Sequence, residues 1–203
     1  MTDTPATIDP QNTVDPKSTI LLVMDYQPAI LSHLDDSDAL LSRLAGAIAT
    51  VRDHGAQVGY VRVAFDESDY AAIPATNKAF APLAGGGYLH HEDSESAVHD
   101  DVAPHPGDII VRKTRVGAFS TTDLDQQLHD RGLTTLILAG ISTSGVVLST
   151  VRDAADRDYQ VFVLADASAD PDTEVHDFLT QRIFPAQVHV ITIAELPNLL
   201  SPA

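Results

Sequence analysis

Short apolar segments alternate along the chain with longer stretches in which apolar residues recur every three or four positions. The apolar segments are continuous enough to form buried strands, and they cover residues 18–27, 57–65, 108–112, 134–140, 160–166 and 187–193. The longer stretches have the period of amphipathic helices, and they cover residues 37–55, 122–131, 145–157 and 172–184. This alternation predicts an α/β fold, with a doubly wound, mostly parallel six-stranded sheet flanked by helices in the Rossmann-like manner.

The length of 203 residues is typical of one α/β domain. We expect a single domain over residues 18–203, preceded by a flexible arm over residues 1–17 that is rich in Thr, Asp, Pro and Asn. Residues 66–106 form a long, weakly periodic connection between two predicted strands. Connections of this length are usually functional or are ordered by short helices.

The composition excludes several classes of function. The chain contains no cysteine, so disulfides, thiolate metal sites and thiol nucleophiles are not available to it. A net charge of −17 repels nucleic acids and anionic lipids, so we expect no nucleic-acid partner and no membrane partner. No apolar run approaches the roughly 20 residues of a spanning helix, and the first residues lack the features of a signal peptide. We therefore expect a cytoplasmic protein that binds a small molecule.

Three polar features follow predicted strands at their carboxyl ends, which is where open α/β sheets bind ligands. Asp25 ends the first strand, Lys113 ends the third, and the turn 142–146 follows the fourth. At the mouth of an apolar sheet, burial raises the pKa of a carboxyl group and a neighbouring ammonium lowers it, which poises such a pair for proton transfer. The alternative is equally favoured: Asp25 caps a turn and Lys113 is a surface charge.

The turn itself, in LILAGISTSGVVLST, joins a strand to a helix through Gly140 and Gly145. It has neither the GxGxxG nor the GxxxxGK[ST] pattern, so phosphate or nucleotide binding is only a third hypothesis. A serine nucleophile is disfavoured because GISTSG breaks the GxSxG spacing and no His stands in a recognisable triad position. The amides of Gly145, Val146 and Val147 lie at a helix N-terminus and predict an anion site.

The walls of a substrate pocket are expected around these features. We predict that they include Tyr26, Gln27, Phe65, Arg115, Phe119, Ser142, Thr143 and Ser144, with some of Phe80, Tyr88 and Leu89. For each aromatic residue, packing in the core is the alternative interpretation. Arg115 fits a surface position equally well.

Histidines gather in the long connection, where His90 and His91 precede Glu92 and Asp93. The residue types suit metal ions, but the spacing matches no familiar metal motif. Neighbouring residues also tend to point to different sides of the chain. We therefore predict a solvated loop and no metal site.

Three motifs together resemble a known family. They are LLVMDYQ, VRKTRVGAFSTTDLDQQL and LILAGISTSGVVLSTVRDAADRDYQVFVLADASADPDTEVH, and they are similar to the isochorismatase-like hydrolases, a superfamily that also contains nicotinamidases and other cysteine amidohydrolases. The resemblance covers residues 20–196 apart from the long connection. It implies an Asp, Lys and Cys triad with Asp25 and Lys113 as its first two members, and it aligns Val146 with the cysteine. A valine has no lone pair with which to attack, so thiol amidase chemistry is not available here.

The resemblance leaves two functions open. Enzymes similar to isochorismatase itself also lack the cysteine and cleave a vinyl ether, which makes Asp25 the general acid and Lys113 its partner or the ligand of a substrate carboxylate. The alternative is a catalytically inactive ligand-binding or interaction protein on the same fold. The resemblance also implies a cis peptide bond between Ile141 and Ser142, no cofactor, and a homo-oligomer, either a dimer or a tetramer.

Overall fold

Six parallel strands form one sheet in the structure, a computed structural model that describes residues 13–201. They are β1 (Thr19–Met24), β2 (Gln57–Val63), β3 (Ile109–Lys113), β4 (Thr135–Gly140), β5 (Gln160–Leu164) and β6 (His189–Ile191). Their order across the sheet is β3-β2-β1-β4-β5-β6, and every neighbouring pair is parallel. The doubly wound sheet predicted from the sequence is confirmed. The chain winds outward from β1 in one direction and from β4 in the other, so the ends of these two strands form the topological switch point.

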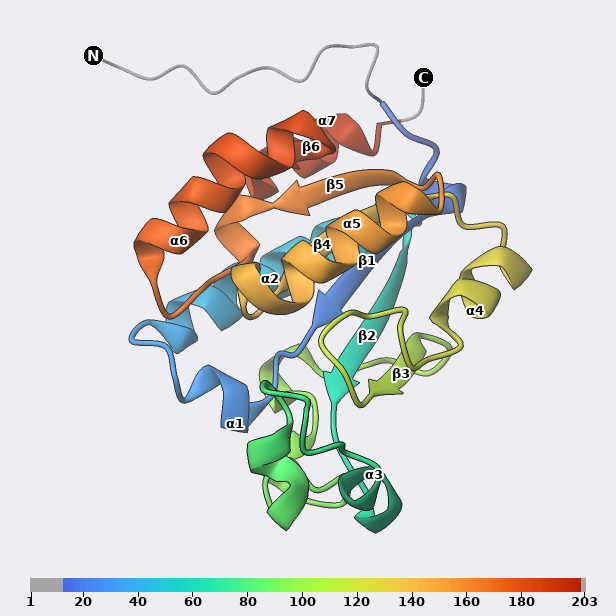
Figure 1. Cartoon of the computed structure of the whole chain (residues 1–203). Helices are drawn as coiled ribbons and strands as arrows, with labels where there is room; N and C mark the ends of the chain where they lie inside the picture. The colour runs from blue at the N-terminus through green and yellow to red at the C-terminus, as the bar shows by residue number, and fades with distance from the viewer. Residues whose placement is uncertain (1–12, 202–203) are drawn as a thin grey trace.

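Helices cover both faces of the sheet, as Figure 1 shows with α5 in front of the strands and α2 behind them. On one face α2 (Ser37–Asp53) and α7 (Leu196–Leu199) pack against alternate residues of β1, including Leu21 and Val23. On the other face α4 (Leu124–Asp130), α5 (Leu148–Asp156) and α6 (Thr173–Phe178) lie over Ile20 and Leu22. All six residues of β1 are buried because its neighbouring side chains point to opposite, equally covered faces.

Two of the predicted helices differ from the observed ones at their ends. The predicted helix 145–157 begins earlier, with a turn of π-helix over Thr143–Val147 that leads into α5. The predicted helix 172–184 is divided into α6, a second π-helical turn over Leu179–Ile183, and a 3₁₀ turn over Phe184–Ala186. Apolar periodicity predicts a helical stretch, but it does not distinguish α-helix from wider or tighter turns.

The long connection 66–106 is ordered by short helices, as expected. It contains α3 (Glu67–Ala71) and 3₁₀ turns over Ala81–Gly85, Ser94–Ser96 and Asp100–Val102. Together with the end of β2 it forms a small hydrophobic cluster of its own, made of Val63, Phe65, Tyr70, Ile73, Phe80 and Leu89. In Figure 1 this lobe lies below the arrowheads of β1 and β2, beside α1 (Pro28–Leu31). The connection therefore lies against the carboxyl ends of the strands.

The part of the predicted arm that the structure describes is not free. Val14 is buried in the main core, and its amide donates a hydrogen bond of 2.9 Å to the carbonyl of Leu199 in α7. Within the predicted arm, residues 13–17 thus lie against the core, and the remainder, residues 1–12, lies outside the described residues. Over residues 13–201 no helix is long and apolar enough to cross a membrane.

Candidate active site

Asp25 and Lys113 form a buried ion pair at the carboxyl end of the sheet. Asp25 directly follows β1, Lys113 is the last residue of β3, and only β2 separates the two strands. The Nζ atom of Lys113 lies 2.8 Å from Oδ2 of Asp25, and the two side chains are 2% and 7% exposed. Asp25 adopts a left-handed backbone conformation with φ +60°, an uncommon state for a residue other than glycine and one that marks functional sites. The pair predicted from the strand ends is brought together.

Burial dominates the electrostatics of this pair. Removal from water raises the pKa of Asp25 above its ordinary value of 3.8, and the charge and hydrogen bond of Lys113, together with the nearby backbone amide of Val63, oppose the rise without cancelling it. The second carboxyl oxygen, Oδ1, is also buried, and it has no hydrogen-bond partner within residues 13–201. A buried carboxyl oxygen without a partner is costly unless it carries a proton or meets a ligand. Asp25 therefore combines a raised pKa with a buried carboxyl oxygen that has no partner among the described residues.

Lys113 keeps part of its hydrogen-bonding capacity. Its ammonium group donates to Oδ2 of Asp25 and, at 3.2 Å, to the carbonyl of Arg115. An ammonium has three N–H donors, and these two acceptors are the ones that the described part of the chain provides. One N–H is left for a ligand.

The turn after β4 forms the third side of the site. The peptide bond between Ile141 and Ser142 is cis, as the resemblance implied. The next residues are held from the β5–α6 connection, since the amide of Thr143 donates to the carbonyl of Ala169 and that of Ser144 donates to Oδ2 of Asp170, each at 2.8 Å. These bonds position the start of the π-helical turn, on which Val146 lies.

The predicted anion site on this turn is not present in the predicted form. The amides of Gly145 and Val147 both donate to the carbonyl of Ser142, at 3.1 and 3.3 Å, because the π-helical turn folds back onto that residue. Two of the three predicted donors are thus already used, which also removes the basis for a phosphate cradle. The amide and the hydroxyl of Ser142 itself donate no hydrogen bond to the described chain.

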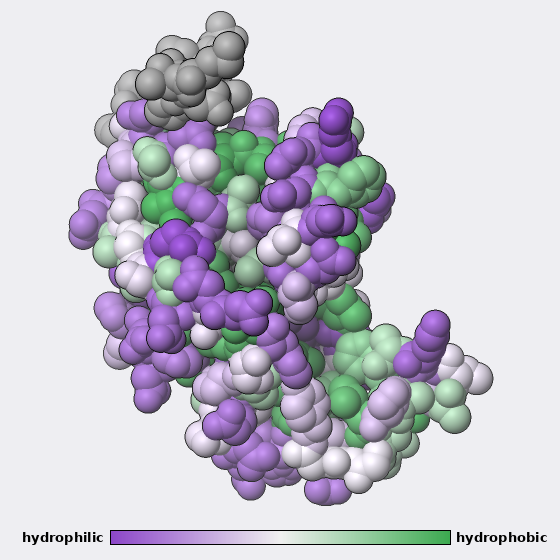
Figure 2. Space-filling model, turned by 90° about the vertical axis from the view of Figure 1, so that its left-hand side faces the viewer, coloured by the Kyte–Doolittle hydropathy of each residue, from purple (hydrophilic) through white to green (hydrophobic). Residues whose placement is uncertain are grey.

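A pocket of about 300 Å³ connects these groups. Its polar lining comes from Asp25, Lys113, Ser142 and, at an exposed position, His33. Its apolar lining comes from Ile30, Val63, Phe80, Leu83, Leu89, Val116, Ile141, Val146 and Pro171, and Gly145 completes it. The face shown in Figure 2 is hollowed between the main body and the lower lobe, with hydrophobic residues visible beside the hollow.

Comparison with known proteins agrees with this geometry. The isochorismatase domain matches residues 19–195, which is most of the chain. The chain belongs to the isochorismatase family.

Named relatives of this isochorismatase-family chain differ in what they do. The chain is 33% identical over 172 residues to the isochorismatase family protein YwoC of Bacillus subtilis, and the alignment covers 85% of this chain and 88% of the relative. It is 36% identical over 164 residues to the phenazine biosynthesis protein PhzD of Pseudomonas fluorescens, covering 80% and 77%. It is 34% identical over 176 residues to the ureidoacrylate amidohydrolase RutB of Methylobacterium radiotolerans, covering 76% and 68%. The chain is therefore a hydrolase of the isochorismatase type.

Solved structures share the fold. An isochorismatase family protein from Burkholderia thailandensis superposes with a TM-score of 0.78 at 27% identity, covering 94% of this chain and 99% of the other. A cysteine hydrolase from Pseudomonas syringae gives a TM-score of 0.81 at 23% identity, with 98% of each chain covered, which is a likeness of fold alone.

Val146 lies where the family resemblance aligns the cysteine nucleophile. It is 2% exposed and lines the pocket beside Gly145 and Ser142. Its position is set by close packing, because a Cβ added to Gly140 would lie 3.2 Å from its Cγ1 atom. An apolar side chain thus occupies this wall of the isochorismatase-type pocket.

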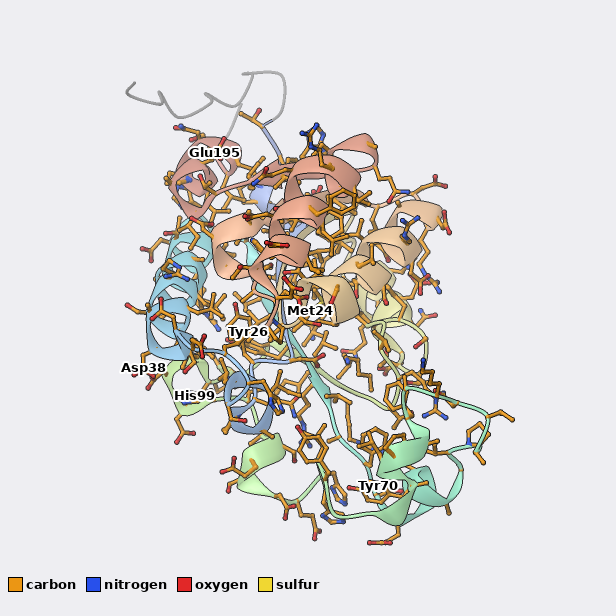
Figure 3. All side chains as sticks on the ribbon, turned by 60° about the vertical axis from the view of Figure 1, so that its left-hand side comes forward. Met24, Tyr26, Asp38, Tyr70, His99 and Glu195 are labelled. Carbon is orange, nitrogen blue, oxygen red and sulfur yellow. The ribbon has the colours of Figure 1, made fainter. Side chains whose placement is uncertain are left out.

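Several residues predicted for the pocket walls support it from behind instead. The hydroxyl of Tyr26 donates 2.6 Å to the carbonyl of Ala167, and Figure 3 shows Tyr26 with Met24 at the centre of the molecule. The side-chain amide of Gln27 joins β2 to the long connection: it donates to the carbonyls of Val63 and Ser96 and accepts from the amide of Val63. The pocket prediction is wrong for both, because their polar atoms satisfy backbone groups.

The predicted aromatic walls are also only partly correct. Phe65 stacks on Tyr70 inside the small hydrophobic cluster of the lower lobe, and Tyr70 is labelled in Figure 3. Phe119 stacks on Tyr159 in the core cluster that also contains the buried residues of α4 and α5. Neither lines the pocket, and for both the core interpretation is the correct one. Phe80 and Leu89 do line it, whereas Tyr88 does not.

Of the remaining residues that were predicted for the pocket walls, one lines the pocket and three do not. Ser142 lines the pocket. Thr143 is buried and its hydroxyl lies 2.8 Å from Nδ1 of His176, Ser144 is exposed, and the guanidinium of Arg115 lies 5.4 Å above the ring of Phe80. None of these three is part of the lining.

Sequence reasoning missed Ile30, His33, Val63, Leu83, Val116, Ile141 and Pro171. The sequence could have pointed to Val63, because it lies at the carboxyl end of β2, the strand beside β1.

The predicted geometry of the histidines in the long connection also needs a correction. The rings of His90 and His91 lie 4.9 Å apart, and ligand atoms of His90, His91 and Glu92 all lie within 4.8 Å of one another. Adjacent residues here point to the same side because the chain turns after His90. The absence of a metal stays a prediction.

Proposed function

We propose that this isochorismatase-family hydrolase cleaves a small carboxylated enol ether without a covalent intermediate, with Asp25 as the general acid. The observation that carries the proposal is the carboxyl group of Asp25, which belongs to a residue of the pocket lining and whose Oδ1 atom is buried without a partner within the described residues. A raised pKa keeps a larger share of this carboxyl group protonated than water would allow. An acid held in this way can protonate a weak base such as an enol carbon.

The reaction has three steps, and none of them needs a nucleophilic side chain. The π electrons of the enol ether take the proton of Asp25 at the terminal carbon, which becomes a methyl group, and leave an oxocarbenium ion stabilised by the ether oxygen. Water then adds to the cationic carbon and returns a proton to the Asp25 carboxylate. Collapse of the resulting hemiketal breaks the carbon–oxygen bond to the leaving alcohol, so that an enolpyruvyl ether and water give an alcohol and pyruvate.

Lys113 has two tasks in this scheme. Its bond to Oδ2 orients the carboxyl group and leaves Oδ1 without a partner among the described residues. Its ammonium charge stabilises the carboxylate that Asp25 becomes after proton transfer. Its remaining N–H donor can bind the carboxylate of the substrate, which holds the enol carbon next to Asp25.

The absence of cysteine supports this reaction over amide hydrolysis. RutB is named as an amidohydrolase, but a thiol mechanism of amide hydrolysis is not available to a chain with no cysteine. Val146 in the pocket wall offers no atom that could replace the thiol. Vinyl-ether cleavage needs an acid, water and a binding site, and all three are compatible with the observed pocket.

The experiment that tests the type of reaction uses purified protein with 2-phenoxyacrylate, isochorismate, and a panel of simple esters and amides. We expect pyruvate only from the enol ethers, measured with lactate dehydrogenase. In water labelled with ¹⁸O the phenol should contain no label, because the bond that breaks is the one to the enol carbon. Hydrolysis of amides or esters in place of enol ethers would refute the proposal. Ligand binding without any product would favour the non-catalytic alternative.

A further inference from the structure

The charges inside the pocket limit the number of carboxylate groups that a bound substrate can carry. Of the lining residues, Asp25 and Lys113 are the ionisable groups in the buried part, and the other ionisable one, His33, is exposed. In the acid form of Asp25, which is the form that the proposed reaction uses, the buried end carries one positive charge, that of Lys113. One substrate carboxylate neutralises it, and a second would be left in an apolar environment without a partner.

Nearby cations do not supply a second anion site. The guanidinium of Arg115 lies over the ring of Phe80, outside the lining. Two of the three amides of the predicted anion site are already used, because those of Gly145 and Val147 donate to the carbonyl of Ser142. The hydroxyl of Ser142 is the one side-chain hydroxyl among the lining residues.

The walls are apolar and firmly supported. Phe80 is 9% exposed and packs against Phe65 at a ring distance of 6.1 Å. Leu89 is held by backbone pairing, since its carbonyl accepts the amide of Phe65 at 2.9 Å. A wall fixed in this way cannot easily rearrange to expose polar groups to a ligand. Hydroxyl groups of a ligand that lie against Phe80 and Leu89 would therefore lose water without gaining partners.

From these observations, and resting on the function proposed above, we infer the substrate class: an enol ether with a single carboxylate and an apolar leaving group, such as a phenol or a benzylic alcohol. Doubly charged or polyhydroxylated substrates fit the pocket poorly. Lys113 binds the carboxylate, Asp25 faces the enol carbon, and the leaving group lies against Phe80, Leu83 and Leu89.

A binding experiment tests this class separately from turnover. The probes are saturated and hence unreactive: 2-phenoxypropanoate, its analogue with a second carboxylate on the ring, and its analogue with two ring hydroxyls. Calorimetry with the whole chain should show that 2-phenoxypropanoate binds at least about 100-fold more tightly than the dicarboxylate, and roughly 10-fold or more tightly than the diol. Equal affinities, or no binding of 2-phenoxypropanoate, would overturn the inference.

A pair of variants at Leu83 provides the matched control. Leu83 is half-buried on a 3₁₀ turn, so a longer polar residue can extend toward solvent without loss of the fold. Leu83→Arg should improve dicarboxylate binding by at least about 10-fold, whereas Leu83→Gln, which adds length without charge, should not. A dicarboxylate affinity that is the same in both variants would contradict the assignment of this wall to the leaving group.

The two proposals can fail independently. If 2-phenoxypropanoate binds selectively while 2-phenoxyacrylate is not hydrolysed, the reaction is wrong and the ligand class stands. If mono- and dicarboxylated enol ethers are hydrolysed with equal kcat/KM, the reaction stands and the substrate class is wrong.

Discussion

Replacing Gly140 by alanine tests how the end of β4 and the site are packed together. A Cβ at this position would lie 3.0 Å from Cγ2 of Val147, 3.2 Å from Cγ1 of Val146 and 3.2 Å from Cβ of Met24. Two of these atoms belong to the turn that carries the pocket wall, and the third belongs to the neighbouring strand, in register with Gly140. The new methyl group therefore meets close contacts on both sides.

The change in the free energy of unfolding that Gly140→Ala causes is the sum of two opposing contributions. Overpacking by one methyl group costs about 1–3 kcal/mol, and the reduced freedom of the unfolded chain returns about 0.4–1 kcal/mol. We expect Gly140→Ala to lower the free energy of unfolding by about 1–2 kcal/mol. The melting temperature of a chain of this size should then fall by roughly 2–8 °C. Because Val146 must shift, binding of 2-phenoxypropanoate should weaken as well.

Urea denaturation followed by circular dichroism measures the stability. Gly46→Ala is the matched control, since Gly46 lies within α2 with no atom within 4 Å of an added Cβ, and there alanine should stabilise by about 0.5–1 kcal/mol. Val147→Ala should itself destabilise, because Val147 is fully buried, but combined with Gly140→Ala the loss should be smaller than the sum of the two single losses, because the closest contact is then removed. If Gly140→Ala is as stable as the parent chain, or if the double variant shows no coupling, the packing described here is wrong.

Two further predictions concern the ionisable pair and Val146. In the proposed reaction the acid form of Asp25 is the active one, and its pKa is raised above 3.8. We therefore expect kcat/KM for 2-phenoxyacrylate to be highest at low pH and to fall as the pH rises through the raised pKa. A rate that increases with pH over that range would show that the base form of Asp25 is active instead. Val146→Cys introduces the one thiol of the chain into the pocket, and it should leave enol-ether hydrolysis within about threefold of the parent, because a similar volume is kept and no step uses residue 146. Its alkylation by iodoacetamide should be slowed by 2-phenoxypropanoate, and alkylation that is indifferent to this ligand would remove residue 146 from the pocket.

The sequence predicted the features that depend on local pattern. Continuous apolar segments revealed the six strands. The place of Asp25 and Lys113 at strand ends made their meeting one of two equally favoured interpretations, since parallel strands end at one edge of the sheet, and the structure brings the two side chains together. The resemblance supplied the cis peptide bond at Ile141 and the position of Val146. These predictions rest on one strand or one motif at a time.

The features that were predicted wrongly depend on how distant segments meet. Nothing local to Tyr26 or Gln27 shows that their polar atoms bind Ala167 and Val63 in place of a ligand. The π-helical turn that consumes the amide of Gly145 arises from the geometry of the turn after β4 and from bonds to the β5–α6 connection. The place of Leu83 in the pocket could not be predicted from local sequence either, because it depends on how residues 66–106 fold against the sheet.

The measurement that tests the central claim most directly is the single-turnover rate of Asp25→Asn with 2-phenoxyacrylate, together with its affinity for 2-phenoxypropanoate. Asp125→Asn is the control, because Asp125 is also paired with a cation, Arg157 at 2.9 Å, but lies on α4 and is not part of the pocket lining. If Asp25 is the acid, the rate should fall by about 10²–10⁴-fold, while the variant still binds the unreactive analogue and Asp125→Asn retains the parent rate. An Asp25→Asn variant that is folded, binds the analogue and hydrolyses the enol ether at the parent rate would contradict the account.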